Sequence, residues 1–201
     1  MTSRTFYQLL TAVVVPRPIA WVSSTSESGV DNLAPHSFFT VACVSPPVIQ
    51  FTSVGRKDSL RNIERTRGFV VNLACEQLRE QINVTSTNFP PNVDEFAAAG
   101  LAKEPSRLVT PPRVAQSPVA LECELHSTVC LGDSTVVFGR VVHAAVDERV
   151  LVAGHPAIDR LRPVARLGRD EWATVGAVMD MPRPVYQADN DRQDIDPTRY
   201  R

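Results

Sequence analysis

The amino-acid sequence predicts a mostly β fold, an antiparallel β-barrel with helices at its periphery. Three observations lead to this prediction. Short runs of strand-forming residues alternate with turn residues in the first half of the chain, and apolar and polar side chains alternate along residues 119–129. The third is that 16 prolines outnumber 9 glycines, which favours rigid extended turns over long helices. At 201 residues the chain is long enough to bury one substantial core.

The first half begins with three expected strands. Residues 19–24 (IAWVSS) are enriched in strand formers, and residues 27–32 follow as a polar turn. Residues 37–44 then provide a second strand, so the pair indicates a hairpin. A third strand is expected at residues 48–53 (VIQFTS), because Pro46-Pro47 stands at its start, where a strand tolerates proline.

A helix is expected directly after the third strand. Asp58 is placed to cap its N-terminus, Leu60 and Ile63 share one apolar face, and Gly68 is placed to end it. Two more elements follow, a buried strand and a second helix, at residues 69–73 and 76–82.

The second half begins with an irregular stretch. Residues 87–118 are rich in proline and contain one short helical segment, residues 93–99, so we interpret them as a surface excursion. The alternation over residues 119–129 predicts a half-exposed strand. Residues 136–146 are apolar on both faces, which predicts that core, a ligand or another subunit covers both sides of this strand.

The chain is expected to form one barrel domain over residues 1–176, followed by a tail. Residues 177–201 carry nine charges and three prolines, which is typical of a segment that is either flexible or laid over a partner. We expect this tail to pack on the partner subunit or over the mouth of the binding site.

Charge and motif content exclude several classes of protein. With 21 basic and 22 acidic residues the net charge is −1, which argues against a nucleic-acid partner. No two glycines stand two apart, so the dinucleotide-binding fingerprint is absent. Four cysteines without C-x-x-C spacing argue against a zinc site and, with no apolar leader at the start, predict reduced thiols in a cytoplasmic protein. The longest apolar stretch, residues 13–22, is broken by Pro16, Arg17 and Pro18, which argues against a membrane span.

The strongest local signal for binding is the stretch from Thr52 to Ser59 (TSVGRKDS). It combines three hydroxyls, two cations, a flexible glycine and the free N–H groups of a helix N-terminus, which together suit a phosphate. The alternative is an ordinary polar turn with a helix cap. The local pattern predicts an anion site without identifying the anion.

A second candidate lies at residues 32–39 (NLAPHSFF). Pro35 fixes the backbone, while Asn32, His36 and Ser37 supply hydrogen-bonding groups beside two aromatic side chains. This mixture is found where a flat heteroaromatic ring is held and hydrogen-bonded along its edge. The alternative is a hairpin whose phenylalanines fill the core.

Five ordered blocks resemble a known family. They are VPRPIAWVS at residues 15–23, NLAPHSFF at 32–39, PPVIQFTS at 46–53, KDSLRNI at 57–63 and FVVNL at 69–73, with weaker echoes at residues 83–96 and 166–168. In this order and spacing they resemble the flavin reductase-like domain family, in its flavoredoxin-type branch. The resemblance implies an FMN-binding split barrel with a Greek-key arrangement that pairs into a homodimer, with FMN near the subunit interface.

The resemblance also assigns roles to residues. The residues it places around the isoalloxazine ring are Asn32, Ala34, Pro35, Ser37 and Phe38. Those it places around the ribityl phosphate are Thr52, Ser53, Arg56, Lys57 and Ser59, with Gly55 inside the same segment. Because a phosphate carries close to two negative charges near neutral pH, Arg56 and Lys57 are the expected counter-charge.

For His36 and Arg17 the sequence allows two interpretations each. His36, named as the candidate catalytic residue, either tunes the flavin edge or meets a nicotinamide, or else is a turn histidine bonded to backbone. Arg17, held between two prolines, either reaches FMN or a partner subunit or covers apolar surface with its stem. Arg166 is a candidate second phosphate or substrate contact.

Five further side chains are expected to be structural. Trp21 and Trp172 are expected to be core or interface aromatics, and Cys43 a buried thiol that simply packs. Asp94 and Glu95 are expected to cap and solvate a short helix rather than to take part in chemistry.

The function implied by the resemblance is an NAD(P)H:flavin oxidoreductase that passes a hydride from nicotinamide to FMN. It fits the reductase component of a two-component monooxygenase. Two alternatives stand beside it: an FMN-containing electron-transfer protein that does not oxidise nicotinamide, and a non-catalytic dimeric barrel.

Overall fold

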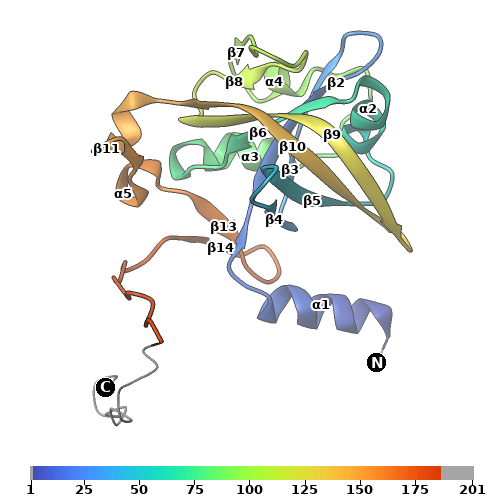
Figure 1. Ribbon diagram of the computed structural model, residues 1–201. Helices are drawn as coiled ribbons and strands as arrows, with labels where there is room; N and C mark the ends of the chain where they lie inside the picture. Colours follow the sequence, from blue (N-terminus) through green and yellow to red (C-terminus); the bar gives the residue numbers. More distant parts are fainter. Residues whose placement is uncertain (1, 187–201) are drawn as a thin grey trace.

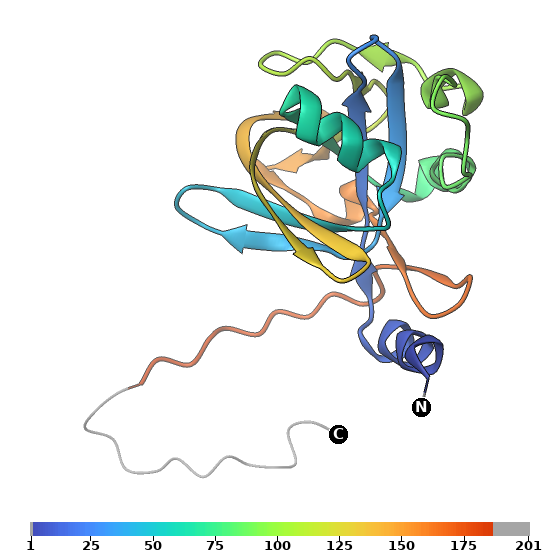
Figure 2. The same cartoon turned by 90° about the vertical axis from the view of Figure 1, so that its right-hand side faces the viewer.

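A computed structural model describes residues 2–186 (Figure 1). Its centre is one seven-stranded antiparallel sheet with the order β3-β2-β6-β9-β10-β5-β4. The sheet curls so that β3 approaches β5, which partly closes a barrel (Figure 2). The strands are β2 (Ala20–Thr25), β3 (Asp31–His36), β4 (Phe39–Cys43), β5 (Val48–Val54), β6 (Gly68–Leu73), β9 (Val119–Leu131) and β10 (Ser134–Val146). The predicted mostly β, antiparallel fold is therefore confirmed.

Helices and small sheets surround the barrel. The helices are α1 (Ser3–Val13), α2 (Asp58–Thr66), α3 (Arg79–Val84), α4 (Glu95–Ala98) and α5 (Ile158–Leu161), with 3-10 turns η1 (Glu76–Leu78) and η2 (Glu148–Val150). One small sheet has the order β1-β13-β14, and two others pair β11 with β12 and β7 with β8. Their strands are β1 (Arg17–Pro18), β7 (Lys103–Glu104), β8 (Arg113–Val114), β11 (Leu151–Val152), β12 (His155–Pro156), β13 (Val164–Arg166) and β14 (Trp172–Thr174).

Strand β2 separates two apolar cores, and so all of its residues are buried. Successive side chains of a strand point to opposite faces. Val22 lies in the core inside the barrel together with Leu60 of α2, whereas Trp21 lies in a second core beneath α3 and α4 with Phe96. The helices that border the candidate site are thus anchored from both sides of one strand.

The longest hairpin, β9–β10, bends across the molecule and is shaped by one glycine. A Cβ atom built on Gly139 would lie 2.2 Å from Cζ of Phe69, so only glycine lets the Phe69 ring occupy this part of the core. The register between β9 and β10 shifts next to Gly139, between it and Phe138. Such irregularities bend a strand, which helps the sheet to curl.

The first hairpin differs from the sequence prediction. The hairpin partner of β2 is β3, which includes the end of the expected turn and three of the expected ring-binding residues, Asn32, Ala34 and Pro35. The expected strand at 37–44 is shortened to β4. Pro35 lies opposite Trp21 in this pair. Because β3 is an edge strand, the missing N–H of a proline is tolerated there.

The ends of α2 also differ from the prediction. Lys57, not Asp58, is the N-cap residue, and Asp58 is the first helical residue, where it pairs with Arg61. The helix ends at Arg67 in the left-handed conformation (φ 65°), and Gly68 already begins β6.

Helix α1 was not anticipated from the sequence, and Arg17 holds its end. The Arg17 guanidinium donates to the carbonyls of Thr11 and Val14 at the end of α1, and to that of Leu167 at 2.7 Å. Arg17 is only 7% exposed, and burial lowers its pKa, with nearby Arg166 as the second cause. Both sequence interpretations of Arg17 were therefore incomplete: it joins the end of α1 to the loop that follows β13.

Apolar side chains remain uncovered at both ends of the described chain. On α1 the exposed ones include Phe6, Leu10 and Val13, which are 51–63% exposed. Residues 175–186 run away from the barrel without helix or strand (Figure 2). The rest of the expected tail, residues 187–201, lies outside the described residues. Among the residues described, no helix is long and apolar enough to cross a membrane.

Candidate functional site

A cavity of about 210 Å³ lies between β3, the first turn of α2 and the segment that follows α3. Six residues that the sequence predicted for flavin contact or catalysis meet in it: Asn32, Ala34, Pro35, His36, Lys57 and Ser59. The remaining lining residues are Asp58, Thr85, Ser86, Thr87, Asn88, Phe89 and Glu95. The structure thus joins parts of both sequence candidates into one cavity.

Ser59 connects the strand to the helix at this cavity. Asn32 and His36 lie four residues apart on β3 and therefore point to the same face. The Asn32 amide donates to Oγ of Ser59 at 3.1 Å, and Nε2 of His36 lies 3.3 Å from the same oxygen. All three residues are buried, so the β3 edge and the first turn of α2 are held in a fixed relation.

His36 is uncharged near neutral pH. Burial, together with the smaller effect of the positive charge of Lys57, lowers the pKa of its imidazole to about 4. Its ring packs against Phe51, with 4.6 Å between the ring centroids. His36 can therefore donate or accept one hydrogen bond at the cavity, but it supplies no cation there.

The N-terminus of α2 presents unpaired donors to the cavity. Lys57 occupies the N-cap position, and no side chain caps the helix. The first N–H groups of a helix lack intrahelical partners and, with the helix dipole, favour an anion. Lys57 lines the cavity at the same point, and no ion pair holds its ammonium group within the part of the chain that the structure describes. This corner has the chemistry of a phosphate site.

The sequence interpretation missed the third wall. Residues 85–89 follow α3 and line the cavity, although most of them fall in the stretch interpreted as a surface excursion. Thr85 is fixed because it accepts from Nε1 of Trp21 at 2.9 Å and donates to the carbonyl of Ile82 at 3.0 Å. The run of hydroxyls and an amide in TSTN at residues 85–88 is the sequence signal that marks this wall.

Glu95 was expected to be solvated, and this expectation was wrong. It is only 6% exposed, and Oε2 accepts from the backbone N–H of Leu33 at 2.6 Å. Burial raises the pKa of its carboxyl to about 7, opposed by the Leu33 N–H. Asp94 caps α4 as predicted, accepting from Phe96 N at 3.0 Å. A carboxyl that titrates near neutral pH therefore borders the cavity.

Six other predicted flavin residues do not line this cavity. Thr52 and the buried Ser53 lie at the end of β5, and the Ser53 hydroxyl donates to the carbonyl of Gly55 at 2.9 Å. The N–H of Gly55 donates to the backbone carbonyl of Asp133 at 2.8 Å, and the Arg56 guanidinium forms an ion pair with the Glu64 carboxylate at 2.6 Å. The last two, Ser37 and Phe38, lie between β3 and β4, where the Phe38 ring is 5.9 Å from the Arg17 guanidinium carbon.

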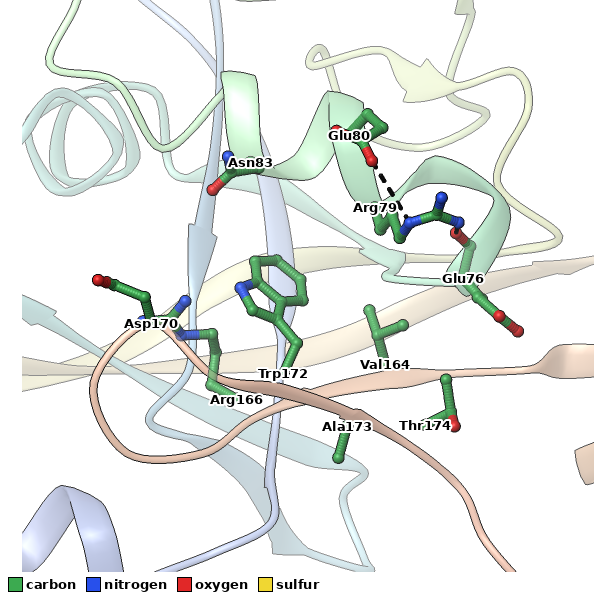
Figure 3. A pocket seen from close by; sticks show the side chains of 10 residues that line it. All are labelled: Glu76, Arg79, Glu80, Asn83, Val164, Arg166, Asp170, Trp172, Ala173 and Thr174. Carbon is green, nitrogen blue, oxygen red and sulfur yellow. Dashed lines mark hydrogen bonds and ion pairs between the residues drawn. The ribbon is translucent and has the colours of Figure 1, made fainter.

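Arg166 lies at a different and larger cavity of about 730 Å³ (Figure 3). Its guanidinium carbon is 5.3 Å from the centre of the Trp172 ring, and Nη2 donates to the carbonyl of Arg169 at 2.6 Å. The indole of Trp172 points from β14 toward α3, where Asn83 and the Arg79–Glu80 pair lie (Figure 3). Arg166 and Lys57 are thus associated with separate cavities.

Two of the expected structural residues can be placed directly. Trp21 is a core residue as predicted, because it is completely buried. Cys43 was predicted to be a buried thiol, but it is exposed on the edge strand β4. The prediction failed because the outer face of β4 has no covering element in the described chain.

The sequence model of the family described as "Flavin reductase like domain" matches residues 12–160. The chain belongs to the flavin reductase-like family. The crystal structure of nitrilotriacetate monooxygenase component B from Bacillus cereus is similar with a TM-score of 0.87 and 32% identity, covering 90% of this chain and 95% of the other.

Two more distant structures share the fold. A flavin reductase with a split barrel domain from Shewanella frigidimarina gives a TM-score of 0.83 at 21% identity, covering 92% of this chain and 94% of the other. Flavoredoxin of Desulfovibrio vulgaris gives 0.77 at 24% identity, covering 84% and 91%. The predicted split-barrel fold and the resemblance to flavoredoxins are thereby confirmed, and family membership supports a flavin-using oxidoreductase.

The two titrating groups at the cavity predict opposite pH effects on stability. Glu95 keeps its proton to about pH 7 when folded, so its contribution to stability falls as the pH rises from about 4.5 through 7. His36 resists protonation when folded, so its contribution falls as the pH drops from 6.5 through 4. Relative to the unmodified protein, Glu95→Gln should gain roughly 1–3 kcal/mol between pH 5 and pH 8, and His36→Gln should lose roughly 1–2 kcal/mol.

Denaturant unfolding at the two pH values measures both differences. Glu104→Gln is the matched control, because Glu104 lies exposed on β7 and pairs with Arg113. Differences that do not change with pH for either variant would contradict the assigned ionisations.

Proposed function

We propose that this protein binds FMN at the β3–α2 cavity and oxidises NAD(P)H. The observation that carries the proposal is the meeting of Lys57 and the open N-terminus of α2 with the polar edge of β3. Lys57, Ser59 and the first-turn N–H groups suit the phosphate, because ionised acceptors form the strongest bonds with such donors.

The other wall of the cavity suits the rest of a flavin. Asn32 and the neutral His36 offer hydrogen bonds along one edge, and Ala34 and Pro35 offer a flat apolar backbone between them. Pockets for whole ligands usually measure about 300–1,000 Å³, so a cavity of about 210 Å³ suits one end of the molecule. The remainder of FMN would extend toward residues outside it, where the predicted contacts of Thr52, Ser53, Ser37 and Phe38 remain part of this proposal.

The protein supplies binding and orientation in this reaction. When bound, FMN supplies the redox chemistry, because it accepts a hydride from nicotinamide and passes the electrons on. In this scheme Lys57 fixes the phosphate, and the bonds of Ser59 fix the strand edge against which the ring is oriented. His36 contacts the ring edge as a neutral hydrogen-bonding group. Similarity to a monooxygenase component B favours electron delivery to a separate oxygenase.

A visible spectrum of the purified protein tests this function directly. We expect flavin absorption bands, or binding of added FMN, and bleaching of the bands when NADH or NADPH is added. Bound FMN that only dithionite reduces would instead identify an electron-transfer protein. A colourless protein whose melting temperature FMN does not shift would identify a non-catalytic barrel, since a tight ligand raises the stability of the folded state.

Replacing Lys57 tests the phosphate contact. Lys57→Ala should weaken FMN binding at least tenfold, because bonds to charged groups contribute about 1.5–3 kcal/mol. Riboflavin lacks the phosphate and should bind about equally to both proteins. The two affinities are measured by flavin fluorescence titration.

Arg56→Ala is the matched control, because Arg56 is the neighbouring cation but is paired with Glu64. It should change FMN affinity less than about threefold. Equal losses for FMN and riboflavin in Lys57→Ala would refute the phosphate role.

We further propose that a second copy of the chain covers the exposed apolar side chains and completes the flavin site. The described chain exposes more apolar surface than a soluble monomer usually leaves uncovered. The exposed apolar side chains include Phe6 and Leu10 on α1, Val44 after β4 and Met179 in the C-terminal segment. In this proposal residues 177–201 pack on the partner subunit.

Charges on α1 test the dimer. Phe6 and Leu10 stand four residues apart and share one helix face, so Phe6→Asp with Leu10→Asp should convert a dimer to a monomer in sedimentation equilibrium. Ser28→Asp, in the exposed turn between β2 and β3, should leave the dimer intact. Deletion of residues 177–201 should weaken dimerisation or FMN binding. A monomeric unmodified protein would contradict the proposal. So would a dimer that the double substitution leaves intact, if the deletion also weakens neither dimerisation nor FMN binding.

A further inference from the structure

Glu95 is a buried carboxyl at the cavity that the proposed chemistry does not use. It starts the short helix α4, which packs on β3. Oε2 accepts from the backbone N–H of Leu33, and no hydrogen bond to Oε1 is formed within residues 2–186. The side chain lines the same cavity as Lys57 and Ser59. One carboxyl oxygen is thus fixed to the strand, while the other is available to a ligand.

A negative charge at Glu95 conflicts with an anionic ligand. A phosphate paired with Lys57 would share one cavity of about 210 Å³ with the Glu95 carboxyl. Two anions in such a partly dry space repel strongly, because solvent screens them poorly. The charged and titratable groups around Glu95 are Lys57 and Asp58 of α2, Asp94 of its own helix, Lys103 bound to Asp94 and Asp31, and the neutral His36 of β3.

We propose that Glu95 determines which flavins bind, because its carboxyl must be neutral when a phosphorylated flavin is present. This inference rests on the proposed FMN site. Binding of the FMN dianion above neutral pH then takes up one proton from solvent, which Oε1 of Glu95 holds, since Oε2 accepts from Leu33. Riboflavin carries no phosphate, so its binding leaves the charge of Glu95 unchanged.

The electrostatics of the free site favour this behaviour. Burial raises the pKa of Glu95 to about 7, and the nearby Asp58 and Asp94 also raise it, while the Leu33 N–H and Lys57 lower it. A phosphate dianion adds a further negative charge and would raise this pKa again. At neutral pH the carboxyl is therefore poised to take up a proton on binding.

Proton uptake makes FMN affinity depend on pH. Above about pH 7 the FMN dissociation constant should rise by up to tenfold per pH unit, since one proton is bound with each ligand. The second ionisation of a phosphate, with a pKa near 6, is largely complete in this range. His36 titrates near pH 4 and does not contribute. Ionisations of the flavin ring are common to FMN and riboflavin and cancel in their comparison.

Fluorescence titration with FMN and riboflavin from pH 6.5 to 9 tests the inference on three full-length proteins: the unmodified chain, Glu95→Gln and Glu104→Gln. The side-chain amide introduced by Glu95→Gln keeps an acceptor for the Leu33 N–H but cannot ionise. We expect the FMN dissociation constant of the unmodified protein and of the Glu104 control to rise at least tenfold over this range. We expect that of Glu95→Gln to change less than about threefold, and riboflavin binding to change little in all three.

The outcomes separate the inference from the proposed function. FMN affinity that does not depend on pH, or depends on it equally in Glu95→Gln, overturns the role of Glu95 and leaves the FMN site standing. Failure of both flavins to bind the unmodified protein at any pH overturns the site and the inference together. If Glu95→Gln does not fold, the unmodified protein alone tests the role of Glu95. Dissociation constants of FMN and riboflavin that diverge above pH 7 support this role, and dissociation constants that change in parallel with pH overturn it.

Discussion

The hydroxyl of Ser59 connects the two elements on which the candidate site is built. It accepts from Asn32 and meets His36, so an edge strand with one free side is held against the first turn of a helix. Behind it, Leu60 and Ile63 fix α2 in the barrel core. The open helix N-terminus, the neutral imidazole and the position of Lys57 all depend on this connection, because a shift of α2 along β3 would separate the cation from the strand edge.

The barrel was largely predictable from the sequence, because its strands coincide with runs of strand-forming residues that are either apolar throughout or alternate between apolar and polar. Strands β2, β5, β6, β9 and β10 all follow such runs. Strand β3 was not predicted, since Asp31, Asn32 and Pro35 are turn formers and only Leu33 is fully buried among its apolar residues. Its extended form comes from pairing with β2, a tertiary interaction that a local pattern does not contain. Helix α1 escaped prediction for a related reason: its apolar face has no core to pack on within the described chain.

The candidate site was predictable only in part, because the fold divides a contiguous motif and joins it to distant residues. The stretch 52–59 resembled one phosphate loop, yet its residues do not act together. The N–H of Gly55 donates to the carbonyl of Asp133 in the turn of the β9–β10 hairpin, and Ser53 bonds to the carbonyl of Gly55, whereas Lys57 and Ser59 face β3. The third wall, residues 85–89, comes from another part of the chain. The burial of Glu95 was likewise not predictable from the sequence, since it depends on where α4 packs.

The anchoring of Arg17 has a consequence for where this fold begins and ends. The region that matches the family, residues 12–160, contains Arg17 but neither Thr11 nor Leu167, two of the three residues whose carbonyls surround its guanidinium. A polypeptide trimmed to the shared family region would therefore keep a buried cation and lose most of its acceptors, which is costly in a protein interior. The part of the chain that satisfies Arg17 is thus larger than the segment that matches the family, and the two flanking segments are coupled through one side chain.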